Sequence, residues 1–180
     1  MALTAQQIAT IAARLWSDDD CATFALLDGA GIPALPDKLQ QAPELEFECL
    51  YSGELEPGVA DMAPYIARLE AGSEFATWVM HGWGQKRGVF AQAPRDVGLP
   101  VLRRHFRKLN MVYGPDASPL LFRYYDPRVM QMFLSVCEGD ERKQLFGPVI
   151  RYVFEGDGMA EGVTASAPDG ELVKEHFSLT

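Results

Sequence analysis

The segment Leu120–Val129 constrains the fold more than any other part of the chain. A run of aromatic and large aliphatic residues, Leu120 to Tyr125, ends at the dipeptide Asp126-Pro127. Such residues are typical of a strand, whereas Asp-Pro stops a strand and suits the cap and first position of a helix. The sequence therefore predicts a strand that leads into a helix, with Asp126 as the cap and Pro127 as the first helical residue.

Arg123 lies inside this apolar run and needs a partner. Strand alternation would place Arg123 on the same face as Leu121 and Tyr125, where a cation requires a carboxylate or carbonyl. Asp126 or an acidic residue elsewhere could supply it. One interpretation is a structural ion pair that holds the strand to the helix, because buried charges are usually paired. The other is a partner-binding site that includes Arg123, Asp126 and Arg128.

The length and apolar content of the chain predict one compact unit. It has 180 residues, of which 48% are hydrophobic, which is enough to bury a core. We expect an α+β fold close to the α/β class, with a small mixed β-sheet flanked by helices. An α/β lobe over residues 1–125 would be followed by a smaller, mainly helical C-terminal lobe with a terminal hairpin over residues 126–180.

Local patterns locate the individual elements. Thr4 and Gln7 form a capping-box pattern at the start of an amphipathic helix. Further helices are predicted to begin at Ser73 and Leu99, and Pro168-Asp169-Gly170 is typical of a hairpin turn. Apolar or alternating runs predict strands at residues 22–27, 47–51, 65–69, 88–93 and 149–155.

Charge is unevenly distributed along the chain, whose formal net charge is −9. Residues 1–85 carry three basic and 13 acidic side chains, residues 86–128 carry nine and three, and residues 129–180 carry four and nine. The acidic flanks would repel nucleic acid, and no RRM, KH or zinc-finger pattern is present. We therefore expect no nucleic-acid partner.

The central basic block contains a predicted amphipathic helix. Leu102, Phe106 and Leu109 form its apolar stripe. The opposite face carries Arg103, Arg104, Arg107 and Lys108. This face is either a solvated helix surface or a site that attracts an acidic protein segment.

Trp83 stands between two glycines, Gly82 and Gly84. A tryptophan in this setting is either a plug that packs under the loop or an exposed anchor for a partner protein. Both alternatives remain open from the sequence alone.

The residues that usually carry catalysis form no recognisable motif. The chain has three histidines and three cysteines, but no HExxH, GxSxG, Walker or GxGxxG pattern. The cysteines are widely spaced and odd in number, which favours free thiols. We expect no catalytic residue, metal or cofactor, although a hydrolase built from distant residues remains an alternative. No leader or membrane-spanning pattern is present, so we expect a cytoplasmic protein without a membrane partner.

Several short segments, taken in order, resemble the domain of unknown function 4123 family. They are FALLDGA at residues 24–30, DMAPYI at 61–66, GWG at 82–84, LRRHF at 102–106, LFRYYDPR at 121–128 and FGPV at 146–149. The resemblance extends from about Ala22 to Phe154, and the segment around Arg123 is its most specific part.

The resemblance implies a function in bacterial type VI secretion. Proteins of this family are adaptor chaperones that bind a toxic effector in the cytoplasm and deliver it to the spike protein of the secretion machine. It implies no catalytic residue for this chain. We expect partner contacts at Trp83, Arg103, Arg104, Arg107, Arg123, Asp126 and Arg128. An immunity protein that neutralises a toxin is the alternative, followed by a small hydrolase.

Overall fold

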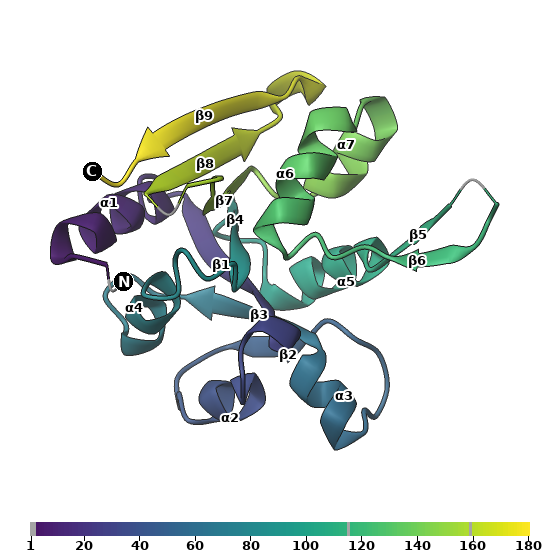
Figure 1. The fold of residues 1–180 in the computed structure, drawn as a ribbon, viewed down its shortest axis with the longest axis horizontal. Coiled ribbons are helices and arrows are strands. Elements are labelled where there is room, and N and C mark those ends of the chain that lie inside the picture. Colours follow the sequence, from purple (N-terminus) through teal and green to yellow (C-terminus); the bar gives the residue numbers. More distant parts are fainter. Residues whose placement is uncertain (1–2, 115, 159) are drawn as a thin grey trace.

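A seven-stranded antiparallel sheet organises the molecule (Figure 1). The computed structural model describes residues 3–114, 116–158 and 160–180. The strand order in the large sheet is β2-β3-β1-β4-β7-β8-β9, and β5 and β6 form a separate two-stranded ribbon. The strands are β1 (Cys21–Asp28), β2 (Phe47–Cys49), β3 (Pro64–Leu69), β4 (Gly88–Pro94), β5 (Met111–Tyr113), β6 (Pro119–Leu121), β7 (Arg151–Glu155), β8 (Glu161–Ser166) and β9 (Val173–Ser178).

Helices cover both faces of this sheet. They are α1 (Ala5–Leu15), α2 (Leu35–Gln40), α3 (Pro57–Met62), α4 (Glu74–Met80), α5 (Leu99–Leu109), α6 (Pro127–Val136) and α7 (Gly139–Phe146). Short 3-10 helices span Gly29–Gly31 and Pro168–Gly170. No described helix combines the length and apolarity that crossing a membrane requires. The predicted α+β class is confirmed.

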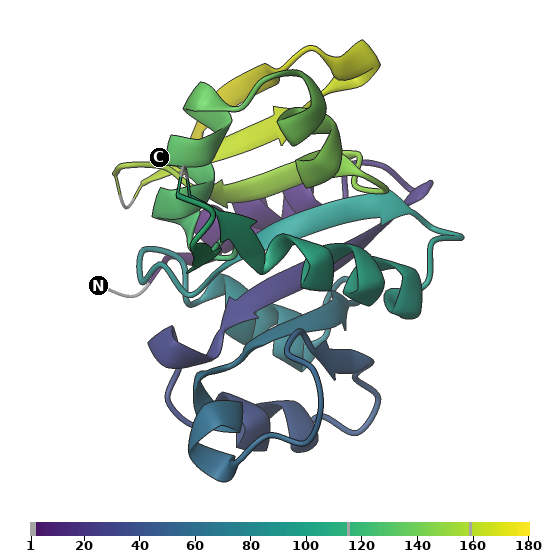
Figure 2. The ribbon, with the colours of Figure 1, turned by 90° about the vertical axis from the view of Figure 1, so that its right-hand side faces the viewer.

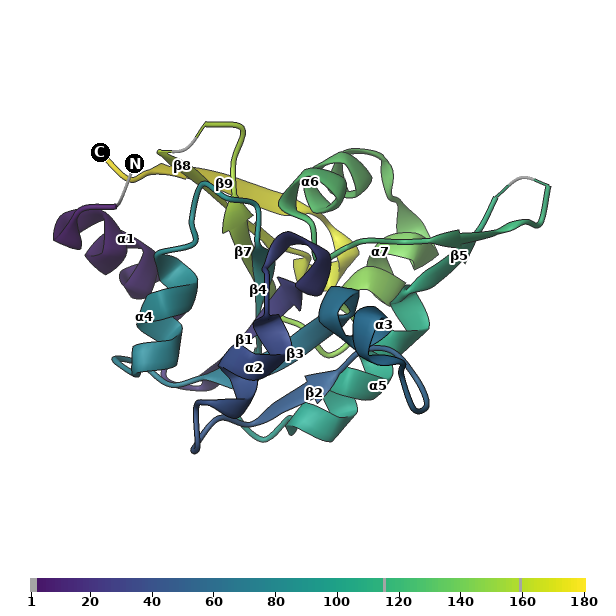
Figure 3. The ribbon, with the colours of Figure 1, turned by 60° about the horizontal axis from the view of Figure 1, so that its bottom comes forward.

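The sheet separates two hydrophobic cores. All eight residues of β1 are buried, because this strand lies in the interior of the sheet with helices on each side. Phe24 and Leu26 belong to the core under α5, α6 and α7, whereas Ala25 and Leu27 belong to the core under α1, α2 and α4. Figure 3 shows α1 and α4 on one side of β1 and β4, and α5, α6 and α7 on the other.

The C-terminal strands continue the same sheet. β7 pairs with β4, with Phe90 opposite Val153, and β8 and β9 follow as a hairpin around Pro168–Gly170. The terminal hairpin is thus confirmed. Every described pairing is antiparallel, so the sheet is not mixed. The predicted boundary between residues 125 and 126 falls between strands of one sheet, and the part expected to be mainly helical supplies three of them. Figure 2 shows these strands stacked along the sheet.

The strand predicted over residues 120–125 is wrong for most of its length. Only Pro119–Leu121 is a strand, β6, and it pairs with β5 rather than with the large sheet. The chain then turns, and Phe122, Tyr124 and Tyr125 are all buried. Tyr124 and Tyr125 belong to the same hydrophobic core, and two adjacent residues of a regular strand cannot both point into one core, because strand side chains alternate between faces. Burial of these rings therefore overrides strand geometry.

The helix start after this turn agrees with the prediction. Asp126 caps α6, and its side chain accepts a hydrogen bond from the backbone N–H of Arg128 at 3.0 Å. Pro127 is the first helical residue. At the other end of the chain, Thr4 and Gln7 form the predicted capping box of α1.

Candidate functional site

Four charged residues meet where β1 ends and α6 begins. We call Asp28, Arg123, Asp126 and Arg128 the carboxylate–arginine cluster. Arg123 forms an ion pair with Asp28, whose other carboxylate oxygen accepts a hydrogen bond from the backbone N–H of Ala30 at 3.2 Å. The partner of Arg123 is therefore an acidic residue elsewhere in the chain and not Asp126.

Asp126 is paired within its own helix start. Arg128 reaches back so that its Nη2 lies 2.7 Å from Oδ2 of Asp126 and its Nε lies 3.0 Å from Oδ1. Burial opposes ionisation of Asp126, but hydrogen bonds from the side chain and backbone of Arg128 outweigh it and lower the pKa of the carboxyl. The same hydrogen bond raises the pKa of the Arg128 guanidinium. This pair stays charged and is not arranged for proton transfer.

The cluster presents cations to the outside and keeps its carboxylates inside. The carboxylate side chains of Asp28 and Asp126 are each only 4% exposed, whereas the side chains of Arg123 and Arg128 are 40% and 69% exposed. Burial lowers the pKa of Arg123, but its attraction to Asp28 more than compensates. The cluster thus holds the fold together and leaves guanidinium groups at the surface.

A second set of hydrogen bonds fixes the turn that carries Arg123. The hydroxyl of Tyr124 donates to the backbone carbonyl of Phe106 at 2.9 Å and lies 3.1 Å from Oδ1 of Asn110. Asn110 in turn donates from Nδ2 to the carbonyl of Leu50 at 2.7 Å. The end of α5, the segment after β2 and the turn before α6 are therefore tied together.

The basic face of α5, formed by Arg103, Arg104, Arg107 and Lys108, lies where the sequence predicts it. The apolar stripe opposite this face is buried at Leu99, Leu102 and Phe106. Together with Glu48, Ser52 and Pro100, the four basic residues line a hollow of about 520 Å³.

The cations of this face differ in how they are paired. Arg103 donates to the carbonyl of Cys49 at 3.1 Å and lies 3.4 Å from a carboxylate oxygen of Glu48. Arg107 donates to the hydroxyl of Ser52. In the part of the chain that the structure describes, Arg104 and Lys108 form no ion pair. The face therefore retains uncompensated positive charge in an otherwise acidic molecule.

Trp83 lies in the core. The residue is 5% exposed and its ring stacks on Phe90, with the two ring centroids 6.2 Å apart. The ring of Phe177 packs against it at a tilt, with a centroid distance of 6.1 Å. Of the two alternatives for Trp83, the structure shows the packing one. The partner contact expected at Trp83 is therefore wrong, because Phe90 of β4 and Phe177 of β9 cover the ring.

The comparison with protein families agrees with this arrangement of motifs. The family model described as a domain of unknown function (DUF4123) matches residues 23–144. The chain belongs to the DUF4123 family. Neither the curated proteins nor the solved structures gave a match. The DUF4123 match includes the carboxylate–arginine cluster, the basic face of α5 and the β5–β6 ribbon, whereas β7, β8 and β9 lie outside it.

His105 connects two of the motif segments, LRRHF at residues 102–106 and FGPV at residues 146–149. The first lies inside the DUF4123 match and the second lies just beyond its C-terminal end. Nε2 of His105 lies 3.1 Å from the carbonyl oxygen of Leu145, and burial lowers the pKa of the imidazole. Gly147 lies against the ring and has a positive φ of 46°, which favours glycine. A Cβ at Gly147 would lie 2.5 Å from Cε1 of His105. His105 therefore acts as a packing residue, and glycine is required opposite it.

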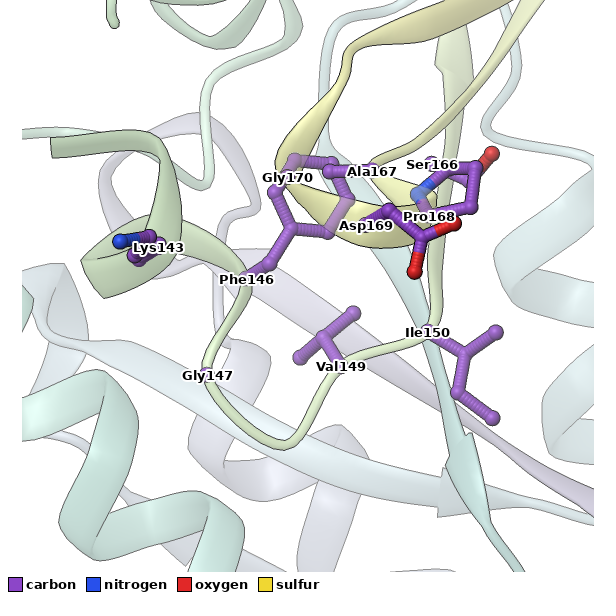
Figure 4. A pocket seen from close by; sticks show the side chains of 10 residues that line it. All are labelled: Lys143, Phe146, Gly147, Val149, Ile150, Ser166, Ala167, Pro168, Asp169 and Gly170. Atoms are coloured by element: carbon purple, nitrogen blue, oxygen red, sulfur yellow. The ribbon is translucent and has the colours of Figure 1, made fainter. Parts of the chain in front are cut away.

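A pocket beside the terminal hairpin holds none of the predicted site residues. It has a volume of about 620 Å³ and lies between the end of α7 and the turn Pro168–Gly170. Figure 4 shows Phe146 and Val149 pointing toward that turn. No histidine or cysteine lines it. Among the described residues, no group of three histidine, cysteine or acidic side chains could hold a metal ion.

Sequence reasoning missed Asp28 and Asn110 as members of the site. The sequence analysis places Asp28 only directly after the strand predicted at residues 22–27. The signal in the sequence is that Asp28 directly follows four apolar residues, Phe24 to Leu27. For Asn110, which follows a basic helix, the sequence offers no comparable signal.

Proposed function

We propose that this protein is a non-catalytic adaptor chaperone of bacterial type VI secretion, which acts in the cytoplasm, binds a toxic effector protein and helps load it onto the spike protein. Membership of the DUF4123 family supports the proposal, together with the adaptor role that the sequence resemblance implies. The observation that carries it in the structure is the basic face of α5, with Arg104 and Lys108 unpaired among the described residues. Such a face suits recognition of an acidic protein segment.

The charge pattern favours a protein partner over a small substrate. The charged groups of the carboxylate–arginine cluster are already paired, and the half-buried ring of His105 packs against Gly147. The basic face is an open helical surface that can meet a partner over a wide area. Charged groups at such a rim raise the rate of association and select the partner more than they add affinity.

The test is co-expression of this chain with the toxin and the spike protein encoded beside it, followed by affinity capture and size-exclusion chromatography. The proposal predicts capture of both partners. Capture of the toxin alone, with loss of toxin activity, would identify an immunity protein instead. Capture of neither would contradict both and would favour the search for a substrate of a small hydrolase.

Charge reversal locates the contact. The double variant Arg104→Glu/Arg107→Glu is expected to lose at least about tenfold in affinity for one of the two partners, with a smaller loss at high salt. The matched control is Lys143→Glu/Lys174→Glu, which changes net charge equally at exposed positions on α7 and β9. Equal affinities of the two double variants would show that the basic face is only a solvated surface.

A further inference from the structure

The β5–β6 ribbon, formed by Met111–Tyr113 and Pro119–Leu121, projects from the body of the molecule (Figures 1 and 3). Every residue of its two strands is exposed. Tyr113 is 74% exposed, and Leu120 and Leu121 are each 50% exposed. A two-stranded ribbon gains little stability by itself in water, and exposed apolar surface of this kind marks an interaction site.

Apolar side chains occupy both faces of the ribbon. Met111 lies opposite Leu121, and Val112 lies opposite Leu120. Because strand side chains alternate, these two pairs point to opposite faces. A solvated hairpin normally has one polar face, so a partner that covers only one side would leave the other apolar face in water. The ribbon therefore suits a partner that contacts both of its faces or that continues its sheet with another strand.

Backbone hydrogen bonds show which edge of the ribbon is open. Phe122 donates its N–H to the carbonyl of Asn110, and Gly114 donates to the carbonyl of Ser118, both at 2.9 Å. Hydrogen-bonded and non-bonded pairs alternate in an antiparallel ladder. The pairs Asn110–Phe122 and Gly114–Ser118, at the two ends of the ribbon, are hydrogen-bonded to each other. The alternation therefore makes Val112–Leu120 the hydrogen-bonded pair between them.

The outward groups on the two edges differ. On β5 they are the N–H and C=O of Met111 and Tyr113, which are complete donor and acceptor pairs. On β6 the corresponding positions are Pro119 and Leu121, and proline has no N–H. Proline on an edge strand blocks further pairing. The outer edge of β5 is therefore the one able to accept another strand.

Charge at the base of the ribbon indicates what such a strand carries. The helix α5 leads directly into β5, so Lys108 lies three residues before Met111, near the base of the ribbon. The strands themselves contain no charged residue. A segment that covers them needs apolar side chains along the ribbon and carboxylates near α5. A second copy of this chain, with its net charge of −9, would be repelled as a whole.

We propose that the outer edge of β5 accepts an extended segment of a partner protein as an added strand, with apolar residues over the ribbon and carboxylates against the basic face of α5. Strand addition of this type takes affinity from main-chain hydrogen bonds and specificity from alternate side chains. The inference rests on the proposed function, because it assigns a surface by which the adaptor holds the toxin or the spike protein.

The decisive comparison is between two substitutions at one position. Tyr113→Pro removes the outward N–H of β5 without removing a bond inside the ribbon, whereas Tyr113→Thr keeps the N–H and removes the ring. Affinities for the purified toxin and the purified spike protein are measured for both variants and the wild type. Tyr113→Pro is expected to bind one partner at least about tenfold more weakly than Tyr113→Thr. Equal affinities of the two variants would overturn the proposal.

Amide hydrogen exchange supplies a readout that does not depend on a substitution. In the wild-type complex, the amides of Met111 and Tyr113 are expected to exchange more slowly than in the free chain, because added-strand pairing protects them. Unchanged exchange at both amides in a complex that has formed would also overturn the proposal. Lys108→Glu is expected to weaken the same complex, whereas Lys174→Glu, on exposed β9, should leave it unchanged.

The outcomes separate this inference from the proposed function. Wild-type protein that binds neither the toxin nor the spike protein contradicts both. Wild-type protein that binds, with Tyr113→Pro equal to Tyr113→Thr, contradicts only the role of the β5 edge. A dimer of the free chain in light scattering that Tyr113→Pro dissociates would assign the edge to a second copy and would likewise contradict it.

Discussion

At the scale of residues, the ion pair between Arg123 and Asp28 joins segments that are 95 positions apart in the chain. Among the described residues, Arg123→Ala would leave the buried Asp28 carboxylate with the Ala30 N–H as its one hydrogen-bond donor. An uncompensated buried charge is strongly destabilising, so we expect a loss of about 3 kcal/mol in the free energy of unfolding, measured by urea denaturation. Arg104→Ala is the control, because Arg104 is an exposed arginine that forms no ion pair among the described residues. Equal losses in the two variants would contradict this account of the cluster.

His105 should make stability depend on pH. Burial lowers the pKa of its imidazole below the ordinary value of 6.5. Between 6.5 and the lower folded pKa, the unfolded chain binds more protons than the folded one, so the free energy of unfolding falls as the pH drops through this window. His105→Gln should lack that contribution. Urea denaturation at about pH 7.5 and about pH 5.5 should show a larger decrease for the wild type than for the variant. An equal decrease would contradict the prediction.

At the scale of elements, the β5–β6 ribbon should be dispensable for folding. Its side chains are exposed, so Tyr113→Thr and Leu120→Thr are expected to change the free energy of unfolding by less than about 0.5 kcal/mol. Phe122, one residue beyond β6, is buried against Phe133 with a centroid distance of 4.7 Å. Phe122→Ala should therefore lower stability by about 3 to 5 kcal/mol. Large losses in the two ribbon variants would show that the ribbon supports the fold.

The sequence predicts those elements whose pattern is local. The apolar stripe of α5, the caps of α1 and α6 and the apolar runs of β1, β4 and β7 were each correctly predicted, because periodicity and capping act within a few residues. The strand predicted over residues 120–125 is wrong for most of its length. An aromatic run has the same sequence pattern whether its rings alternate between the faces of a strand or pack together in one core. Likewise, the sequence indicated that Arg123 needs an acidic partner, but only the sheet topology places Asp28 beside it.

At the scale of the whole molecule, one sheet runs through both of the parts predicted at residues 1–125 and 126–180. β4 and β7 lie side by side in its interior, with Ala91 opposite Tyr152. The two parts cannot separate from each other without losing these strand pairings. We therefore expect a single cooperative transition, in which far-UV and near-UV circular dichroism give the same midpoint during urea denaturation. Two separated midpoints would show that the two parts fold independently.

We propose that this DUF4123 protein brings a toxin to the spike protein. The affinity of the purified toxin for the purified spike protein is measured with and without a stoichiometric amount of this chain. We expect a stable toxin–spike assembly only when the chain is present, and weaker assembly with Arg104→Glu/Arg107→Glu or Tyr113→Pro. Equal toxin–spike affinity in the presence and absence of the chain would show that the protein is not an adaptor.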